Sequence, residues 1–255
     1  MSSPAGITST LNSERCMTLF DYFDRGFVIN LPHRKDRRRA VTRELQKAGL
    51  PITPGHIDIF PAIRPDDPGG FPTIGARGCF LSHMEVLKQA ESEGCERLLV
   101  MEDDLRMMPS FRRDADQIVA MLDNADWDLV YLGHREPVSN EGSATTFQLY
   151  DKPIQTTHCY GVHRRCLSSL ASFFQTLLER EPGDPRGGPM FPDGAISTFR
   201  EQNPQIKTLI ACPKLADQRM SRTDIHELKW FDRVPVVRDA ANVGRVIKQR
   251  MRTGG

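Results

Sequence analysis

The sequence predicts an α/β protein with a mostly parallel central sheet flanked by helices. Residues 27–31 (FVINL) and 98–101 (LLVM) are short apolar runs without polar alternation, which is typical of strands buried on both faces. Segments with helical periodicity lie between such runs, for example the stripe formed by Val41, Leu45 and Ala48. Strands that alternate with helices favour a parallel sheet covered by helices.

Length and composition indicate a single globular domain. The chain has 255 residues, of which 39% are hydrophobic and 26% are charged, enough for one sizeable α/β domain. We expect residues 1–22 to form a flexible arm or a loosely packed first turn, residues 23–240 one domain, and residues 241–255 a basic tail. The net charge of +1 supplies no general basic field, so we expect no nucleic-acid partner.

The cysteines and the N-terminus predict a cytoplasmic protein. No C-x-x-C pair occurs, so neither a zinc site nor a redox motif is indicated. Several cysteines stand beside apolar residues, which favours buried free thiols over a disulfide framework. The first residues lack a basic region followed by an apolar core, so no secretory signal is predicted, and no apolar run approaches membrane-spanning length. The six cysteines are Cys16, Cys79, Cys95, Cys159, Cys166 and Cys212.

The other elements follow from periodicity and from turn residues. A helix that starts near Gly75 and Gly78 should end at Gly94, and Ser110 should cap the helix after it. Residues 180–194 are rich in proline and glycine, which predicts a long loop. Further strands are expected at residues 56–63, 128–133, 147–150 and 205–213, and the face formed by Leu167, Leu170, Ala171, Phe174, Leu177 and Leu178 predicts a core helix.

Three adjacent acids, Glu102, Asp103 and Asp104, follow the apolar run at 98–101. Ligands of open α/β sheets bind beyond the carboxyl ends of strands, so these acids stand where a site is expected. Crowded carboxylates repel one another unless a cation neutralises them, and oxygen ligands favour Mg²⁺ or Mn²⁺. Glu102 and Asp104, two residues apart on an extended segment, can point the same way. The alternative is that the acids are solvated strand-end residues or helix caps.

A basic cluster follows the first strand, at His33, Arg34, Lys35, Arg37, Arg38 and Arg39. Cations in the first turn of a helix oppose its dipole, at a cost of roughly 0.3–1 kcal/mol each. A bound anion such as a pyrophosphate would offset this cost, and Arg34 and Arg37 are the residues we expect to turn inward. A solvated basic face, or peripheral contact with acidic lipid, is the alternative.

Three further polar residues stand where a ligand contact is expected. Ser82 and His83 are two polar groups at the N-terminal turn of the helix that starts near Gly75, which suits contact with a ligand, although a histidine on an apolar face is more often a core residue. Asp193 ends the loop at 180–194 and precedes a helical segment, where N-capping is the alternative role.

Taken in order, these segments resemble glycosyltransferase family 25, which includes lipopolysaccharide-type and collagen-type galactosyltransferases. The resemblance spans about residues 27–225. The family's Asn-Leu strand end before an Arg-rich helix is similar to FVINLPHRKDRR, and its Gly-Cys-x-x-Ser-His element is similar to Gly78, Cys79, Ser82 and His83. Its Glu-Asp-Asp motif is similar to Glu102, Asp103 and Asp104, and its Tyr-containing turn to Cys159, Tyr160 and Gly161. Its Pro-x-Asp or Val-Asp element is similar to Phe191, Pro192 and Asp193, and a Ser-x-x-Asp-Ile-like segment to Ser221, Thr223, Asp224 and Ile225.

This resemblance implies a GT-A-type nucleotide-diphospho-sugar transferase fold and a metal-dependent inverting enzyme. Such an enzyme moves a hexose, most often galactose from UDP-galactose, to a saccharide or other hydroxyl acceptor, as in lipopolysaccharide or glycan biosynthesis. It implies Mn²⁺ or Mg²⁺ on Asp104 with Glu102 or Asp103, and Asp193 as the base that takes the acceptor's proton. The implied donor-binding residues are Asn30, Arg34, Arg37, Ser82 and His83, and further donor or acceptor contacts are expected from His158, Tyr160, Ser221 and Asp224.

Other functions fit a similar sheet with an acid cluster. A metal-dependent nucleotidyltransferase usually has a glycine-rich loop directly after its first strand, but this chain has NLPHRKD there, without glycine. A phosphoesterase is a second alternative. From a different class, the chain could be a catalytically silent protein that binds a nucleotide sugar without turnover.

Overall fold

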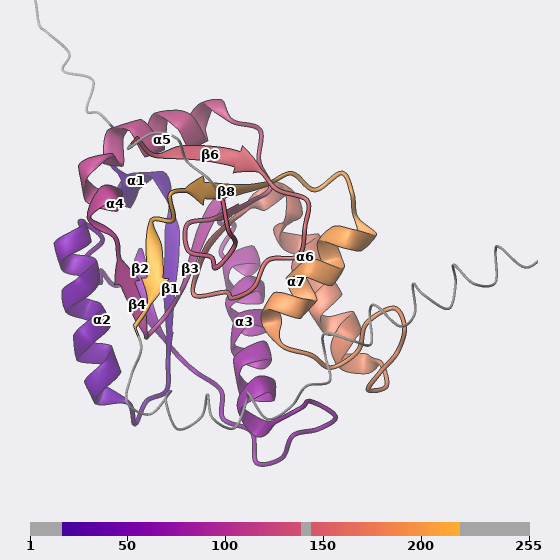
Figure 1. Ribbon diagram of the computed structural model, residues 1–255. Helices are drawn as coiled ribbons and strands as arrows, with labels where there is room; N and C mark the ends of the chain where they lie inside the picture. The colour runs from indigo at the N-terminus through magenta and orange to yellow at the C-terminus, as the bar shows by residue number, and fades with distance from the viewer. Residues whose placement is uncertain (1–16, 139–143, 220–255) are drawn as a thin grey trace, which may run out of the picture. The chain divides into compact units, whose positions relative to one another are not determined.

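The computed structural model describes residues 17–138 and 144–219, which form a seven-stranded sheet with helices around it (Figure 1). Along the sheet the strands are β2 (Ile57–Pro61), β1 (Arg25–Asn30), β3 (Arg97–Glu102), β7 (Cys159–His163), β5 (Leu129–Tyr131), β8 (Thr208–Cys212) and β6 (Thr146–Leu149). β2, β1, β3, β5 and β8 run in one direction, and β7 and β6 run in the other. A mostly parallel central sheet flanked by helices is therefore confirmed.

One short helix precedes β1, and the other helices lie in the connections between strands. The helices are α1 (Leu19–Tyr22), α2 (Lys35–Ala48), α3 (Ile74–Ser92), α4 (Pro109–Arg113), α5 (Ala115–Asn124), α6 (Arg164–Glu179) and α7 (Pro192–Gln202). Two short strands, β4 (Leu105–Met107) and β9 (Ala216–Gln218), pair antiparallel with each other in a separate sheet. The side chain of Thr73 caps α3 by accepting a hydrogen bond from the amide of Ala76 at 3.0 Å.

Each face of the main sheet has its own apolar cluster, because successive strand residues point to opposite faces. On one face, Phe27 and Val100 belong to the cluster that contains buried residues of α3, α6 and α7. On the other face, Val28 and Leu99 belong to the cluster that contains buried residues of α1, α2 and α5. Helices α2 and α3 therefore cover opposite faces of the strands β1 and β3, as Figure 1 also shows.

Most elements expected from periodicity are present. The helix with the Leu167–Leu178 face is α6, in which Leu167, Leu170, Ala171, Phe174 and Leu177 are buried, as predicted. Of the cysteines in the described residues, Cys95, Cys159, Cys166 and Cys212 are buried free thiols, and Cys79 is partly buried.

Three local expectations were wrong. The family resemblance indicated a turn at residues 159–161, but residues 159–163 form the strand β7, which pairs with both β3 and β5. We predicted no strand after the one at 205–213, but residues 216–218 form β9. Ser110 caps no helix, because α4 begins one residue earlier at Pro109 with Met108 at its N-cap position.

The chain before the sheet is packed rather than loose where it is described. Residues 19–22 form α1, whose capping box joins Thr18 and Asp21, and both Leu19 and Tyr22 are buried. The compact unit that contains the sheet extends to Gln218. Residues 220–240 of the expected domain, and the expected basic tail, lie outside the described residues. No helix in the described residues is long and apolar enough to cross a bilayer.

Candidate functional site

The expected site lies where β1 and β3 end. The two strands are parallel neighbours, and Ile29 near the end of β1 pairs with Glu102 at the end of β3. Asn30 ends β1, and α2 begins five residues later at Lys35. Since α2 and α3 follow parallel strands, their N-terminal turns lie at this same edge, which is the position where α/β sheets bind ligands.

Asp103 is held by two residues from the first strand–helix unit. Its Oδ2 accepts a hydrogen bond from the Asn30 side-chain amide at 2.7 Å, and its Oδ1 accepts one from Arg37 Nη1 at 3.1 Å. Asp103 is buried, with 7% of its surface exposed. The guanidinium of Arg37 also lies 3.6 Å from Asp104 Oδ2, so one arginine pairs with two adjacent acids and offsets part of their negative charge. Arg37 therefore turns inward, as expected.

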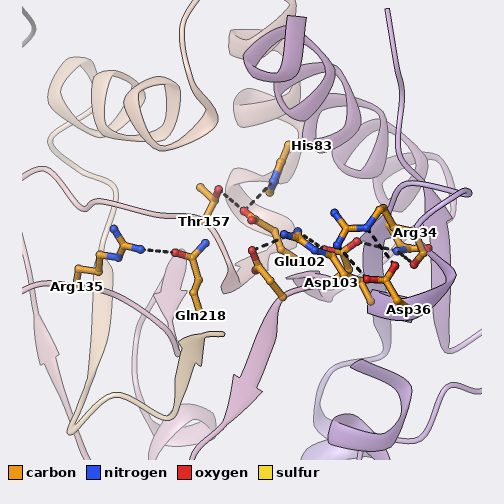
Figure 2. Close-up of polar contacts among 11 residues, drawn as sticks. Arg34, Asp36, His83, Glu102, Asp103, Arg135, Thr157 and Gln218 are labelled. Atoms are coloured by element: carbon orange, nitrogen blue, oxygen red, sulfur yellow. Dashed lines mark hydrogen bonds and ion pairs between the residues drawn. The ribbon is translucent and has the colours of Figure 1, made fainter. Parts of the chain in front are cut away.

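Glu102 points away from these two acids, toward α3 and the segment before β7. It accepts a hydrogen bond from the Thr157 hydroxyl at 2.9 Å, and its Oε1 lies 3.6 Å from Nε2 of His83, as Figure 2 shows. Burial acts to raise the pKa of Glu102, but the contacts with His83 and Thr157 outweigh it and hold the pKa below its usual value. Glu102 is therefore a carboxylate at neutral pH.

The period-two argument for Glu102 and Asp104 is wrong. It requires an extended backbone, but β3 ends at Glu102 and the chain turns at residues 103–104 before β4 begins. As a result Asp103 and Asp104 share Arg37, whereas Glu102 contacts His83 and Thr157. Within residues 17–138 and 144–219, the three acids do not form a group close enough to share one ion through all three carboxylates.

His83 is a fully buried side chain between α3, β3 and β7. Its Nδ1 lies 2.9 Å from the hydroxyl of Tyr160, and the two rings are stacked with centroids 5.8 Å apart. Tyr160 is also buried, and burial raises the pKa of its hydroxyl well above the usual value, so the hydroxyl keeps its proton. The expected contact of Tyr160 with donor or acceptor stays a prediction, and a ligand contact of His83 would use Nε2, because Nδ1 faces the Tyr160 hydroxyl.

Ser82 fixes α3 to the loop after β2. Its buried hydroxyl accepts a hydrogen bond from the Ile63 amide at 2.8 Å and donates one to the Gly78 carbonyl at 2.6 Å. A Cβ at Gly78 would lie 2.5 Å from the Ile63 carbonyl oxygen, so only glycine allows this close approach. Both hydrogen bonds of the buried Ser82 hydroxyl stay within the protein, and the expected contact of Ser82 with a donor stays a prediction.

His158 is buried as well, and it positions backbone rather than substrate. Its Nδ1 lies 2.9 Å from the Thr156 hydroxyl, and its carbonyl accepts a hydrogen bond from the Glu102 amide at 3.0 Å. Burial lowers the pKa of His158, so its ring is neutral. A Cβ at Gly133 would lie 2.1 Å from its Nε2, which explains the glycine two residues after β5. The expected contact of His158 with donor or acceptor stays a prediction.

Asp193 lies in the first turn of α7 and binds the segment that reaches Glu102. Its Oδ2 accepts a hydrogen bond from the Thr156 amide at 3.2 Å, and its Oδ1 accepts one from the Gly194 amide at 2.8 Å. The N-cap of α7 is Phe191, so N-capping is not the role of Asp193. Thr156 has a positive φ of 77°, which is unusual for a β-branched residue. Such strain is found preferentially at functional sites.

The remaining expected residues divide into two groups. Arg34 lies next to this site, where its guanidinium pairs with Asp36 at 3.0 and 3.1 Å and its carbonyl accepts a hydrogen bond from Asn30 at 3.3 Å. Ser221 and Asp224 lie outside the described residues.

Two residues that were not predicted as ligand contacts belong to this site. Thr157 holds Glu102 in place, and no local pattern marks it. Cys79 lies one helical turn before His83, and the side chains of both lie near Glu102. The i, i+4 spacing of Cys79 and His83, which places two metal-ligating residue types on one helix face, could have identified this pair.

The residues at this edge differ in how well they suit the divalent ion that the family resemblance implies. Carboxylate oxygens are the ligands that Mg²⁺ and Mn²⁺ prefer. Asp103 does not fit, because both of its oxygens are engaged by Asn30 and Arg37. Asp104 and Glu102 fit better, since their side chains are 16% and 21% exposed and can reach a ligand.

Comparisons with known proteins give partial matches. No family model matches the chain. Procollagen galactosyltransferase 1-B of Xenopus laevis is 34% identical over 131 residues, which cover 44% of this chain and 21% of that protein. Inactive glycosyltransferase 25 family member 3 of Mus musculus is 29% identical over 132 residues, which cover 45% of this chain and 22% of that protein. The matched part is thus about a fifth of the length of these curated relatives.

Among solved structures, a glycosyltransferase involved in the glycosylation of the major capsid of PBCV-1 aligns with a TM-score of 0.49. The alignment covers 78% of this chain and 95% of that chain, with 12% sequence identity.

The fold and the site define an α/β protein with an acidic and basic cluster at the carboxyl edge of its central sheet. The sequence matches relate this protein to glycosyltransferase family 25, at moderate identity over part of the chain.

Proposed function

We propose that this protein is a metal-dependent inverting glycosyltransferase that moves a hexose, galactose from UDP-galactose, to a hydroxyl of a saccharide acceptor. The observation that carries the proposal is the cluster of Arg37, Asp103 and Asp104 at the ends of β1 and β3, in a chain related to galactosyltransferases. Arg37 lies beside the partly exposed carboxylate of Asp104, so it could donate hydrogen bonds to the oxygens of a diphosphate whose metal ion is bound by that carboxylate.

The proposed reaction is a single displacement at the anomeric carbon. Asp104, whose side chain is 16% exposed, would supply a carboxylate ligand to Mn²⁺ or Mg²⁺, and the ion would stabilise negative charge on the departing nucleoside diphosphate. Arg37 and Arg34 lie on the side of Asp103 and Asp104, where they would face that diphosphate. The acceptor oxygen forms the new bond as the bond to the diphosphate oxygen breaks, which inverts the anomeric carbon.

Asp193 is the proposed general base. Its carboxylate would take the proton from the acceptor hydroxyl during the attack. The amides of Thr156 and Gly194 each donate to one of its oxygens, which fixes the plane of the carboxylate. Because Thr156 immediately precedes Thr157, the same short segment positions both Asp193 and Glu102.

A second candidate function is nucleotide-sugar binding without turnover. Relatives designated inactive match this chain over the same fraction of its length as the galactosyltransferases do, at 29% identity against 34%. Sequence similarity alone therefore does not separate an active transferase from a silent binding protein.

One screen distinguishes these functions. The purified chain is incubated with a panel of nucleotide sugars and with Mn²⁺ or Mg²⁺, and thermal stability and nucleoside diphosphate release are measured. A bound donor at about a hundred times its dissociation constant should raise the free energy of unfolding by about 2.7 kcal/mol. A nucleotide sugar that raises the thermal stability of the chain and also releases nucleoside diphosphate supports the transferase. A nucleotide sugar that raises thermal stability but releases no nucleoside diphosphate with any acceptor tested supports the silent binder. A panel in which no nucleotide sugar stabilises the chain contradicts both.

A further inference from the structure

Cys79, His83 and Glu102 form a compact group of potential metal ligands. The Cys79 sulfur, a ring nitrogen of His83 and a carboxylate oxygen of Glu102 all lie within 4.8 Å of one another. Cys79 and His83 are one turn apart on α3, and Glu102 ends the adjacent strand β3. Among the residues that the structure describes, this is the group of three His, Cys, Asp or Glu side chains placed closely enough to share an ion.

His83 has a nitrogen that the protein leaves without a hydrogen bond. The side chain is 0% exposed, its Nδ1 contacts the Tyr160 hydroxyl, and its Nε2 has no hydrogen-bond partner. The nearest charged group to Nε2 is the Glu102 carboxylate, at 3.6 Å. When Nδ1 donates its proton to the Tyr160 oxygen, the lone pair of Nε2 faces this group. Metal-binding histidines are commonly oriented by such a bond from their other nitrogen.

Negative charge surrounds the Cys79 thiol. Burial raises the pKa of the thiol, and so do the carboxylates of Glu102, Asp193, Asp104 and Asp103. The same charges attract a cation, and a bound cation reverses their effect on the thiol by stabilising the thiolate. Cys79 and Glu102 are both partly exposed, so an ion can reach the group from solvent.

We propose that Cys79, His83 and Glu102 bind a Zn²⁺ ion. A sulfur, a nitrogen and an oxygen ligand suit this borderline-soft ion, whereas Mg²⁺ prefers oxygen alone. Three protein ligands leave a fourth tetrahedral position for water or another external ligand. Binding replaces the proton of the Cys79 thiol, which is released to solvent as the sulfur–zinc bond forms. The proposal rests on the geometry of this group and requires no glycosyltransferase activity.

Cobalt supplies a direct spectroscopic test, because Co²⁺ takes the place of Zn²⁺ and is coloured. The reduced, chelator-treated full chain is titrated with Co²⁺ in the absence of nucleotide sugar. We expect a saturable thiolate-to-cobalt charge-transfer absorption at one ion per chain, which added Zn²⁺ removes. Cys79→Ser should abolish this absorption, and Glu102→Gln should weaken Co²⁺ binding by about tenfold or more.

Cys95→Ser is the matched control. Cys95 is a buried thiol just beyond the opposite end of α3, and this variant should retain the full absorption. Thermal melting of each variant verifies that it is folded, and Glu102→Gln, which preserves side-chain shape, tests the site if Cys79→Ser does not fold. A wild-type chain without the charge-transfer absorption, or an absorption that neither Cys79→Ser nor Glu102→Gln changes, overturns the proposal.

Discussion

At the scale of residues, position along the sequence indicated which side chains meet but not which way they point. The acids after β3 and Arg37 after β1 do come together, because the ends of adjacent parallel strands share one edge. The turn at residues 103–104 separates Glu102 from the other two acids, and a sequence pattern cannot show where a strand stops within one residue. Ser82 was expected at a ligand, but its hydroxyl is buried within the protein.

Asp193→Asn tests the proposed base. Asparagine has nearly the same shape and its oxygen can keep one of the two amide hydrogen bonds that Asp193 accepts, but it cannot take a proton at neutral pH. Since general-base catalysis contributes typically about 10²- to 10⁴-fold, transfer to an acceptor should slow by that factor while donor binding is unchanged. Steady-state kinetics with donor and acceptor varied separately measure both quantities.

Asp184→Asn is the control for this experiment. Asp184 lies in the same loop region, but its carboxylate pairs with exposed Arg186 at 2.9 and 3.1 Å. This variant should turn over as the unmodified protein does. If Asp193→Asn also retains nearly normal turnover, Asp193 is not the base.

At the scale of elements, the sequence predicted the strands that are continuous apolar runs and missed those that are not. β7 contains Tyr160, Gly161 and His163, so its composition resembles a turn as much as a strand. β7 is a strand because it pairs with both β3 and β5, and these long-range pairings cannot be predicted from the local sequence. Helix α3 was expected, but the reason for the glycine at position 78 became clear only from the loop that packs against it.

Gly78→Ala should therefore weaken the docking of α3. The added Cβ would lie 2.5 Å from the Ile63 carbonyl oxygen, and a backbone atom cannot move away without shifting the loop or the helix. Overpacking of this kind costs typically about 1–3 kcal/mol, so the free energy of unfolding should fall by that amount in a urea titration.

Gly75→Ala in the same helix provides the comparison. Its added Cβ meets only the Thr73 hydroxyl oxygen, at an ordinary contact distance of 3.7 Å. Alanine in a helix is favoured over glycine by about 0.5–1 kcal/mol, so this variant should be as stable as the unmodified chain or slightly more stable. Equal destabilisation by both substitutions would contradict the contact with Ile63 as the cause, because the added Cβ at position 75 makes no such contact.

At the scale of the whole molecule, alternation of strands and helices was enough to predict the α/β class, because βαβ units favour parallel strands. The two faces of the sheet, covered by α3, α6 and α7 and by α1, α2 and α5, follow from alternating strand residues. What could not be predicted is how loops from distant parts of the chain converge. The contact that joins Asp193 to Thr156 spans 37 residues, and the one that joins Thr157 to Glu102 spans 55.

The central claim, that a metal-dependent donor site lies at the ends of β1 and β3, is tested most directly by calorimetric titration of UDP-galactose in the presence of Mn²⁺. The dissociation constant is compared for the unmodified chain, for Asp104→Asn, and for Asp116→Asn, whose exposed carboxylate lies in the first turn of α5. We predict that Asp104→Asn weakens donor binding by at least about tenfold, since a carboxylate ligand to the ion is lost, and that Asp116→Asn has no effect. Equal affinity of all three proteins for UDP-galactose would contradict this account.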